Sequence, residues 1–125
     1  AILDAGAAAG VARLLQVGAA GTLKMASGQD VLDSPAFPNE MVAGALGARD
    51  VLALLRAERE LAWCVLTPSA VLESGPRSGS FRVGEDELLT TDDGVSSISL
   101  EDYAVAMIDE LENPQHTGGR FTVGY

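Results

Sequence analysis

Two short apolar runs, separated by one amphipathic segment, constrain the fold of this chain most strongly. Residues 13–17 read RLLQV and residues 62–66 read AWCVL. Continuous apolar runs of this length are typical of parallel strands that are covered on both faces. The segment between them predicts a helix that Asn39 caps, with an apolar stripe made of Val42, Leu46, Val51, Leu52 and Leu55. The alternation predicts an α/β domain with a doubly wound parallel sheet and helices on its faces.

Glycines and prolines mark the limits of these elements. Residues 1–10 predict the end of a helix, and residues 18–21 (GAAG) predict a tight turn of small residues after the first strand. Residues 22–38 predict a loop. Gly44 and Gly47 weaken the central helix locally and indicate close packing there.

The amino-acid composition of the chain changes from residue 75 onward. Residues 75–79 form a polar loop rich in Gly, Ser and Pro. Residues 80–83 and 88–91 predict a small hairpin or lid, joined by the acidic turn at residues 84–87. A further turn is predicted at residues 92–94 (DDG).

The last third of the chain has a clear order of elements. Residues 97–99 predict a short strand, which meets a helix that begins at Leu100. Asn113 and Pro114 end this helix, and residues 120–125 predict a closing strand.

Composition excludes several classes of function. The formal net charge is −10 and the only lysine is Lys24, so we expect no nucleic-acid partner and no anionic membrane surface. Cys64 and His116 are the only residues of their types, which excludes an intrachain disulfide and a Cys/His zinc site. With neither a signal peptide nor a membrane span in the sequence, we expect a cytoplasmic protein.

Most of the remaining polar residues have structural interpretations. Cys64 lies inside an apolar strand and is expected to be a buried, inert thiol. His116 follows the end of a helix and is expected to contact that end. Glu101 and Asp102 near a helix start favour the helix dipole. An acidic group is expected to be a solvated turn and not a calcium site; it consists of Glu85, Asp86, Glu87, Asp92 and Asp93.

An ordered set of segments carries a resemblance to a known family. The set comprises VGAAG at 17–21, FPNE at 37–40, WCVLTPSA at 63–70, ISLEDYA at 98–104 and RFTV at 120–123. It resembles the C-terminal part of the atypical short-chain dehydrogenase/reductase family, in the branch of NADH-flavin-reductase-like and NAD(P)H-binding epimerase-like proteins. The resemblance covers nearly all 125 residues. It implies a Rossmann-like fold, of which residues 1–125 are the C-terminal portion, and an NAD(P)H cofactor.

Two departures from that family limit what the resemblance implies. The glycine-rich fingerprint that holds the pyrophosphate at a helix N-terminus is absent from the chain. The Tyr-x-x-x-Lys pair of the family falls on Met41 and Ala45, neither of which can donate a proton. The chain also begins with Ala, so we expect a fragment, a processed product or an incomplete chain.

The resemblance nevertheless implies a set of site residues. Those expected to bind the cofactor follow the two strands; they are Val17, Gly18, Ala19, Ala20, Thr67, Pro68, Ser69 and Ala70. The alternative for both segments is a purely structural turn or corner. Met41 and Phe81 are expected to touch the substrate, and the Thr22 hydroxyl is a weak catalytic candidate.

Three functional hypotheses remain open at this point. The first is an NAD(P)H-dependent reductase of a small flat acceptor such as a flavin or quinone. The second is a non-catalytic NAD(P)-sensing regulatory or interaction protein, and the third is an inactive fragment that needs its missing N-terminal half. The isolated chain is expected to bind NAD(P)H weakly and to pair with that missing segment or with a second copy, because an open sheet edge invites pairing.

Overall fold

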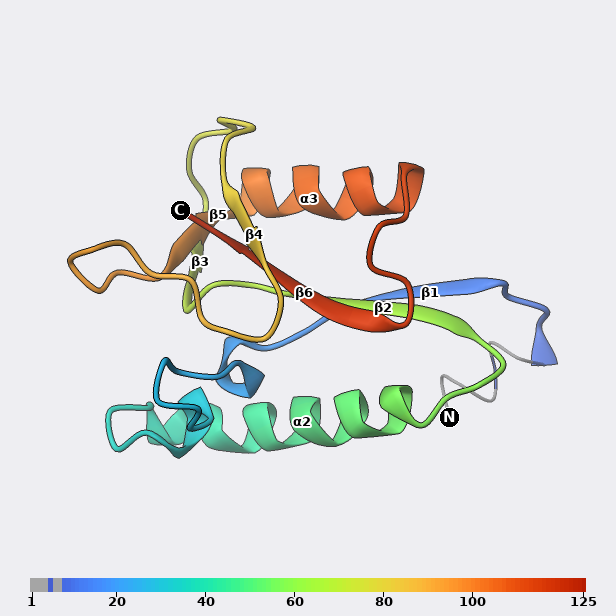
Figure 1. Ribbon diagram of the computed structural model, residues 1–125, viewed down its shortest axis with the longest axis horizontal. Coiled ribbons are helices and arrows are strands. Elements are labelled where there is room, and N and C mark those ends of the chain that lie inside the picture. The colour runs from blue at the N-terminus through green and yellow to red at the C-terminus, as the bar shows by residue number, and fades with distance from the viewer. Residues whose placement is uncertain (1–4, 6–7) are drawn as a thin grey trace.

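The computed structural model describes residue 5 and residues 8–125 (Figure 1). The helix end predicted over residues 1–10 falls mostly on residues 1–4 and 6–7, which lie outside the described residues. The regular elements are β1 (Arg13–Val17), α2 (Val42–Arg56), β2 (Ala62–Thr67), β3 (Val71–Glu73), β4 (Arg82–Gly84), β5 (Ser97–Ser99), α3 (Leu100–Glu112) and β6 (Gly119–Gly124). Three short 3-10 helices, η1 (Ala20–Thr22), η2 (Val31–Asp33) and η3 (Asn39–Met41), lie in the segment between β1 and α2.

The main sheet has the strand order β1-β2-β6-β4. Strands β1 and β2 are parallel neighbours, with Arg13 opposite Ala62 and Val17 opposite Leu66. Strand β6 continues the parallel part beside β2, and β4 pairs antiparallel with β6 at the far edge. A separate two-stranded parallel sheet joins β3 to β5. The predicted parallel neighbours are therefore confirmed, whereas β3 was not predicted.

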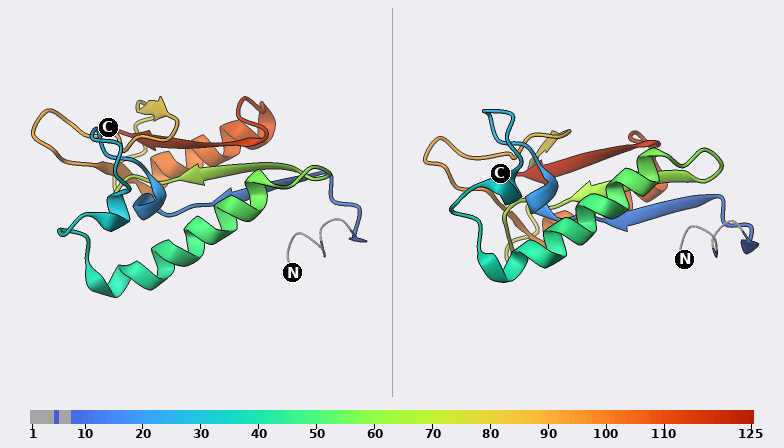
Figure 2. Two further views of the ribbon diagram at one scale, coloured as in Figure 1. Left: turned by 60° about the horizontal axis from the view of Figure 1, so that its bottom comes forward. Right: turned by 90° about the horizontal axis from the view of Figure 1, so that it is seen from below.

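The two long helices cover opposite faces of the main sheet (Figures 1 and 2). Because side chains alternate along a strand, each strand contributes to both layers. Leu52 and Leu55 of α2 pack with Trp63 and Val65 of β2. The core on the α3 face consists of Cys64, Leu66, Ile98, Tyr103, Ala106, Phe121 and Val123. This arrangement confirms the predicted α/β architecture.

The buried thiol and the second long helix agree with the sequence. Cys64 is fully buried, and burial raises the pKa of its thiol to about 12. Helix α3 begins at Leu100, where the Ser99 hydroxyl accepts a hydrogen bond from the Asp102 N–H at 2.9 Å. Among the described residues, no helix combines the length and the apolar character needed to cross a membrane.

The predicted hairpin is wrong. Residues 88–91 form no strand, and β4 pairs instead with β6, where Val83 lies opposite Val123. The segment that was expected to pair with residues 80–83 bonds to Lys24 instead. The Leu88 N–H donates to the Lys24 carbonyl at 2.8 Å, and the Lys24 N–H donates to the Asp86 carbonyl at 2.7 Å. The β4–β6 ladder joins three residue pairs, and the segment after it bonds to Lys24, so the two halves of the predicted hairpin have different partners.

Details of the first strand and of α2 also differ from expectation. Residue Asn39 begins η3 and caps nothing, because Met41 precedes α2 and its side chain makes no capping bond. No atom lies within 4 Å of a Cβ built on Gly44 or Gly47, so neither glycine marks close packing. The buried stripe is narrower than predicted and consists of Ala45, Leu52 and Leu55. Strand β1 is mostly half-buried, because among the described strands it has a neighbour on one side only.

Candidate functional site

The carboxyl ends of β1 and β2 meet at one edge of the sheet. Val17 lies opposite Leu66, and the Gly18 N–H donates to the Leu66 carbonyl at 3.0 Å. The two segments predicted to bind the cofactor, residues 17–20 and 67–70, therefore leave the sheet side by side. Open α/β sheets place ligands at this edge.

Close packing explains the small residues after β1. A Cβ at Gly18 would lie 2.6 Å from the Thr67 hydroxyl oxygen and 2.8 Å from a Val65 methyl carbon. At Gly21 it would lie 2.8 Å from the Cβ of Ala45. Close packing therefore accounts for the glycines at positions 18 and 21. The same small residues form one wall of this edge of the sheet, and Val17 beside them is 54% exposed.

The corner after β2 is tied to strand β6 by two hydroxyl groups, one from each side. The Ser69 hydroxyl donates to the Val123 carbonyl at 2.7 Å, and Thr122 donates to the Thr67 carbonyl at 2.7 Å. Thr67, Pro68 and Ser69 are buried. Ala70 is the exposed residue of this group, so it is the only one of the four whose side chain is accessible from solvent at this corner.

The Thr22 hydroxyl is occupied within the protein. It donates to the Ala19 carbonyl at 2.7 Å and accepts a hydrogen bond from Arg120 Nη1 at 3.0 Å. Thr22 is also 7% exposed. These bonds hold the η1 turn against β6.

An apolar pocket of about 270 Å³ opens beside this edge. It contains two of the predicted residues, Met41 and Ala70. Its other lining residues were not predicted; they are Met25, Val31, Ser34, Ala36, Phe37, Pro38 and Leu88. The sequence signal that could have revealed most of them is the number of apolar residues in the long loop at residues 22–38, because long loops within a compact domain are commonly functional.

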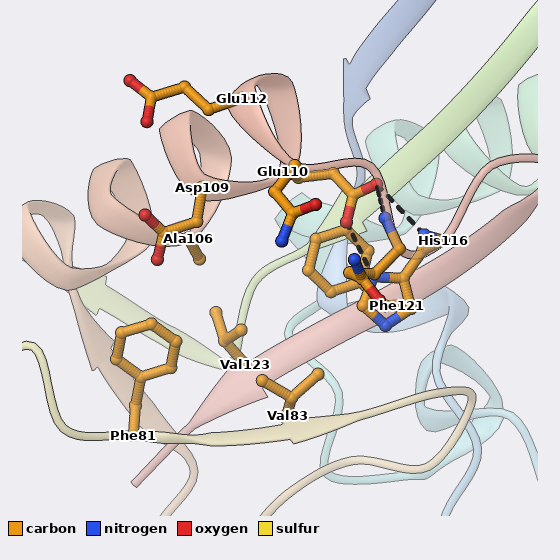
Figure 3. Close-up of a pocket in the computed structure, with 11 residues that line it drawn as sticks. Phe81, Val83, Ala106, Asp109, Glu110, Glu112, His116, Phe121 and Val123 are labelled. Atoms are coloured by element: carbon orange, nitrogen blue, oxygen red, sulfur yellow. Dashed lines mark hydrogen bonds and ion pairs between the residues drawn. The ribbon is translucent and has the colours of Figure 1, made fainter.

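Phe81 lies on the other side of the sheet, so the structure does not bring it together with Met41. Figure 3 shows Phe81 in a second pocket of about 310 Å³ between β4, β6 and α3, where it points toward Ala106. Phe81 also packs against the core on the α3 face. Its sequence neighbours did not reveal this, because the pairing of β4 with β6 decides which face it occupies.

The second pocket holds a carboxylate–imidazole pair (Figure 3). Glu110 Oε1 lies 2.8 Å from His116 Nδ1, and Glu110 Oε2 accepts hydrogen bonds from the Gln115 and His116 N–H groups. The His116 ring stacks on Phe121 at 4.1 Å. Glu110 also pairs with Arg13 at 3.1 Å, which ties the end of α3 to β1.

Burial opposes ionisation of Glu110, but the hydrogen bonds from His116 and Gln115 keep the pKa of Glu110 below its ordinary value. The pair lies just before β6, at the amino end of the parallel strands. It is therefore at the opposite end of the sheet from the predicted cofactor edge. The sequence placed His116 near the helix end correctly, but it did not reveal Glu110 as the partner.

The described residues fit one part of a dinucleotide better than another. The edge offers small residues and an apolar pocket, which suit a flat ring. A pyrophosphate needs N–H donors at a helix N-terminus. At the start of α3 the Ser99 hydroxyl and the acidic residues Glu101 and Asp102 occupy that place, and α2 is preceded by η3, which contains Glu40. Among the described residues, the starts of α2 and α3 therefore do not form a pyrophosphate cradle, whereas the edge has a shape and polarity that suit a flat ring.

Known proteins share this fold and much of its sequence. The crystal structure of a candidate epimerase from Bacteroides thetaiotaomicron is 42% identical, with a TM-score of 0.95 over 99% of this chain and 58% of that one. A candidate NADH-flavin reductase from Streptococcus pneumoniae TIGR4 is 33% identical, with a TM-score of 0.82 over 90% of this chain and 55% of that one. The uncharacterized Bacillus subtilis protein YwnB is 40% identical over 89% of this chain and 54% of that protein. No protein-family model matches the chain.

These similarities confirm the Rossmann-like α/β fold. They place the chain in the structural superfamily that includes the candidate epimerase and the candidate NADH-flavin reductase. The chain spans a little more than half the length of the proteins that it matches.

Proposed function

We propose that this chain forms the nicotinamide and acceptor side of an NAD(P)H-dependent reductase, and that its acceptor is a small flat molecule such as a flavin or a quinone. The observation that carries the proposal is the apolar pocket at the carboxyl edge of β1 and β2, beside the wall of small residues that begins at Gly18. The name of the similar NADH-flavin reductase supports the same class of reaction.

The residues at this edge favour an acceptor that can be reduced without a proton donor from the protein. The cofactor supplies a hydride, and an isoalloxazine or quinone ring takes it together with a proton from solvent. Met41 and Ala45 stand where the family carries its tyrosine and lysine, and neither can donate a proton. Nearby hydroxyls of Thr22, Thr67 and Ser69 are buried, and those of Thr22 and Ser69 donate to backbone carbonyls.

The test is turnover by the natural full-length protein, followed as NADPH or NADH consumption with FMN, riboflavin or a quinone. Ala70→Trp should fill the pocket and raise the KM for the acceptor at least tenfold, because burial of a few methylene groups is worth about one factor of ten. Val83→Trp is the matched control, since Val83 is 55% exposed on β4, away from this pocket. Equal kinetics for the two variants would count against the acceptor pocket.

The second candidate function is a non-catalytic NAD(P) sensor. The occupied hydroxyls and the missing Tyr-x-x-x-Lys pair favour it. Ala19→Trp should weaken nicotinamide binding in both cases, so it tests the binding edge, and only consumption of NADPH separates the sensor from the reductase. If the protein binds the dinucleotide but consumes no NADPH with any of the acceptors, the sensor hypothesis replaces the reductase hypothesis.

The proposed partner is a strand that covers the outer edge of β1. Among the described strands, β1 pairs with β2 alone. We propose that a further strand, from the same protein or from a second copy, covers this edge, because uncovered edges promote aggregation. Size-exclusion chromatography with light scattering, on the full-length protein and on residues 1–125, distinguishes the two sources.

A further inference from the structure

Half of the basic residues of this acidic chain line one pocket. The chain has eight Lys and Arg residues and a net charge of −10. A pocket of about 490 Å³ beside α2 is lined by Lys24, Arg49, Arg56 and Arg120, together with the two carboxylates Asp30 and Asp86. This pocket, here called the basic pocket, therefore carries an excess of two positive charges. The charges converge from η1–η2, α2, the acidic turn and β6, which are far apart in the sequence.

Arg120 forms the rigid inner wall of the basic pocket. Its side chain is 2% exposed on strand β6. Arg120 Nη1 donates to the Thr22 hydroxyl at 3.0 Å, and Nε donates to Asp86 Oδ1 at 3.0 Å. Burial lowers the pKa of Arg120, but a guanidinium stays protonated in proteins, so the charge is permanent.

Three half-exposed cations form the rim. The side chains of Lys24, Arg49 and Arg56 are 49%, 44% and 54% exposed. Arg49 and Arg56 lie two turns apart on one face of α2, about 10 Å along its axis. Arg49 contacts Asp30 through Nη1 at 3.5 Å, and Arg56 contacts Asp86 through Nη2 at 3.3 Å. Each guanidinium has five N–H donors, so these single contacts leave donors for a ligand.

The carboxylates hold the cations in place but offset only half of their charge. Lys24 and Arg49 share Asp30, whereas Arg56 and Arg120 share Asp86. The backbone bond from Lys24 to Asp86 joins the two groups. The cations are therefore positioned before any ligand arrives, which lowers the entropic cost of binding.

We propose that the basic pocket is an anion site that binds a phosphate monoester group. A doubly charged phosphate matches the excess of two positive charges, and its several oxygens match arginine donors on more than one side. Nucleic acid does not fit, because the rest of the chain is strongly acidic.

This site is distinct from the proposed acceptor pocket and does not depend on it. Lys24 and Asp30 line the basic pocket, while their neighbours Met25 and Val31 line the apolar pocket. The two pockets therefore share one loop as a wall. The phosphate belongs either to the acceptor itself, as in FMN, or to a separate small molecule.

The experiment is calorimetric titration of the full-length protein with inorganic phosphate at low ionic strength. We expect saturable binding that the double variant Arg49→Gln/Arg56→Gln weakens at least tenfold, because one charge-assisted hydrogen bond is worth about that factor. Arg59→Gln is the matched control, since Arg59 is an exposed arginine just after α2 that does not line the pocket. Thermal unfolding of all variants checks that the fold is intact.

A comparison of the affinities for FMN and riboflavin then shows whether the phosphate belongs to the acceptor or to a separate ligand. A preference for FMN that disappears in the double variant assigns the phosphate to the acceptor, and equal affinities alongside retained phosphate binding assign it to a separate ligand. Absence of phosphate binding to the folded wild-type protein, or equal binding to the double variant and to Arg59→Gln, overturns the proposal. NADPH consumption is measured separately, so failure of the proposed reductase leaves this result unaffected.

Discussion

Strand β6 has two faces that differ sharply in character. Phe121 and Val123 point to the α3 side and are 3% and 0% exposed within an apolar core. Arg120 and Thr122 are equally buried on the other side, but they are polar and hydrogen-bond to Thr22 and Thr67. The same strand therefore contributes to a core on one face and to the wall of a charged pocket on the other.

The difference follows from what covers each face. Helix α3 adds Tyr103 and Ala106 to the apolar core that contains Phe121 and Val123, whereas α2 packs over β1 and β2 against Leu14, Trp63 and Val65. Beyond α2, loops cover β6, and they bring Thr22 and Asp86. A buried arginine is tolerated there because its donors are satisfied. Coverage by loops is thus what allows a charged pocket to form on a buried strand.

The largest expected effect is on the α3 face. Phe121→Ala should lower the free energy of unfolding by about 3–5 kcal/mol, because it removes a buried ring and leaves a cavity beside His116. Urea denaturation measures the loss. A loss below about 1 kcal/mol would show that the α3 face is not the main core.

Arg120→Met should cost less, about 1–3 kcal/mol. It leaves the Thr22 oxygens without their donor, but Asp86 is 56% exposed and can be solvated. The same denaturation experiment compares it with Phe121→Ala. If Arg120→Met cost more than Phe121→Ala, the polar face would be the more important for stability, contrary to the comparison above.

Glycines at the carboxyl edge of β1 and on α2 provide a matched pair. Gly18→Ala should destabilise by about 1–3 kcal/mol, because its Cβ would collide with Thr67 and Val65. Gly44→Ala should stabilise by about 0.5–1 kcal/mol, because its Cβ meets no atom within 4 Å. Thermal unfolding of both variants should show shifts of opposite sign; shifts of the same sign would contradict the close packing at Gly18.

A smaller effect is expected in acid. Burial opposes ionisation of Asp102, but hydrogen bonds from Tyr125, Ser78 and Gly79 outweigh it and keep the pKa of Asp102 below 3.8. A lowered carboxyl pKa contributes stability that is fully present above 3.8 and is lost as the pH falls through the folded value. Asp102→Asn should therefore be less stable at neutral pH and lose less stability on acidification. Denaturation midpoints across that range measure this, and parallel curves for the two proteins would argue against it.

The smallest effect is expected at the rim of the basic pocket. Arg49→Gln should change the free energy of unfolding by less than about 0.5 kcal/mol, because its pair with Asp30 is partly exposed. The same variant should weaken phosphate binding. A large loss of stability would show that Arg49 serves the fold and not a ligand.

Local pattern was enough to predict the parallel pair β1 and β2, the helices between and after them, and the closing strand. Apolar runs, helical periodicity and the Asn113–Pro114 stop act within a few residues of one another, so they can be read directly from the sequence. The meeting of residues 17–20 with residues 67–70 followed in turn, because parallel neighbours share a carboxyl edge.

Pairing between distant segments was decided only in the tertiary structure. The choice of β6 as partner for β4 put Phe81 on the α3 face, away from Met41. The meeting of the four cations of the basic pocket likewise depends on where loops cross the sheet. Charged side chains in loops carry no periodicity that marks their partners, so the sequence determined the layers of this protein, and long-range packing determined which charges meet between them.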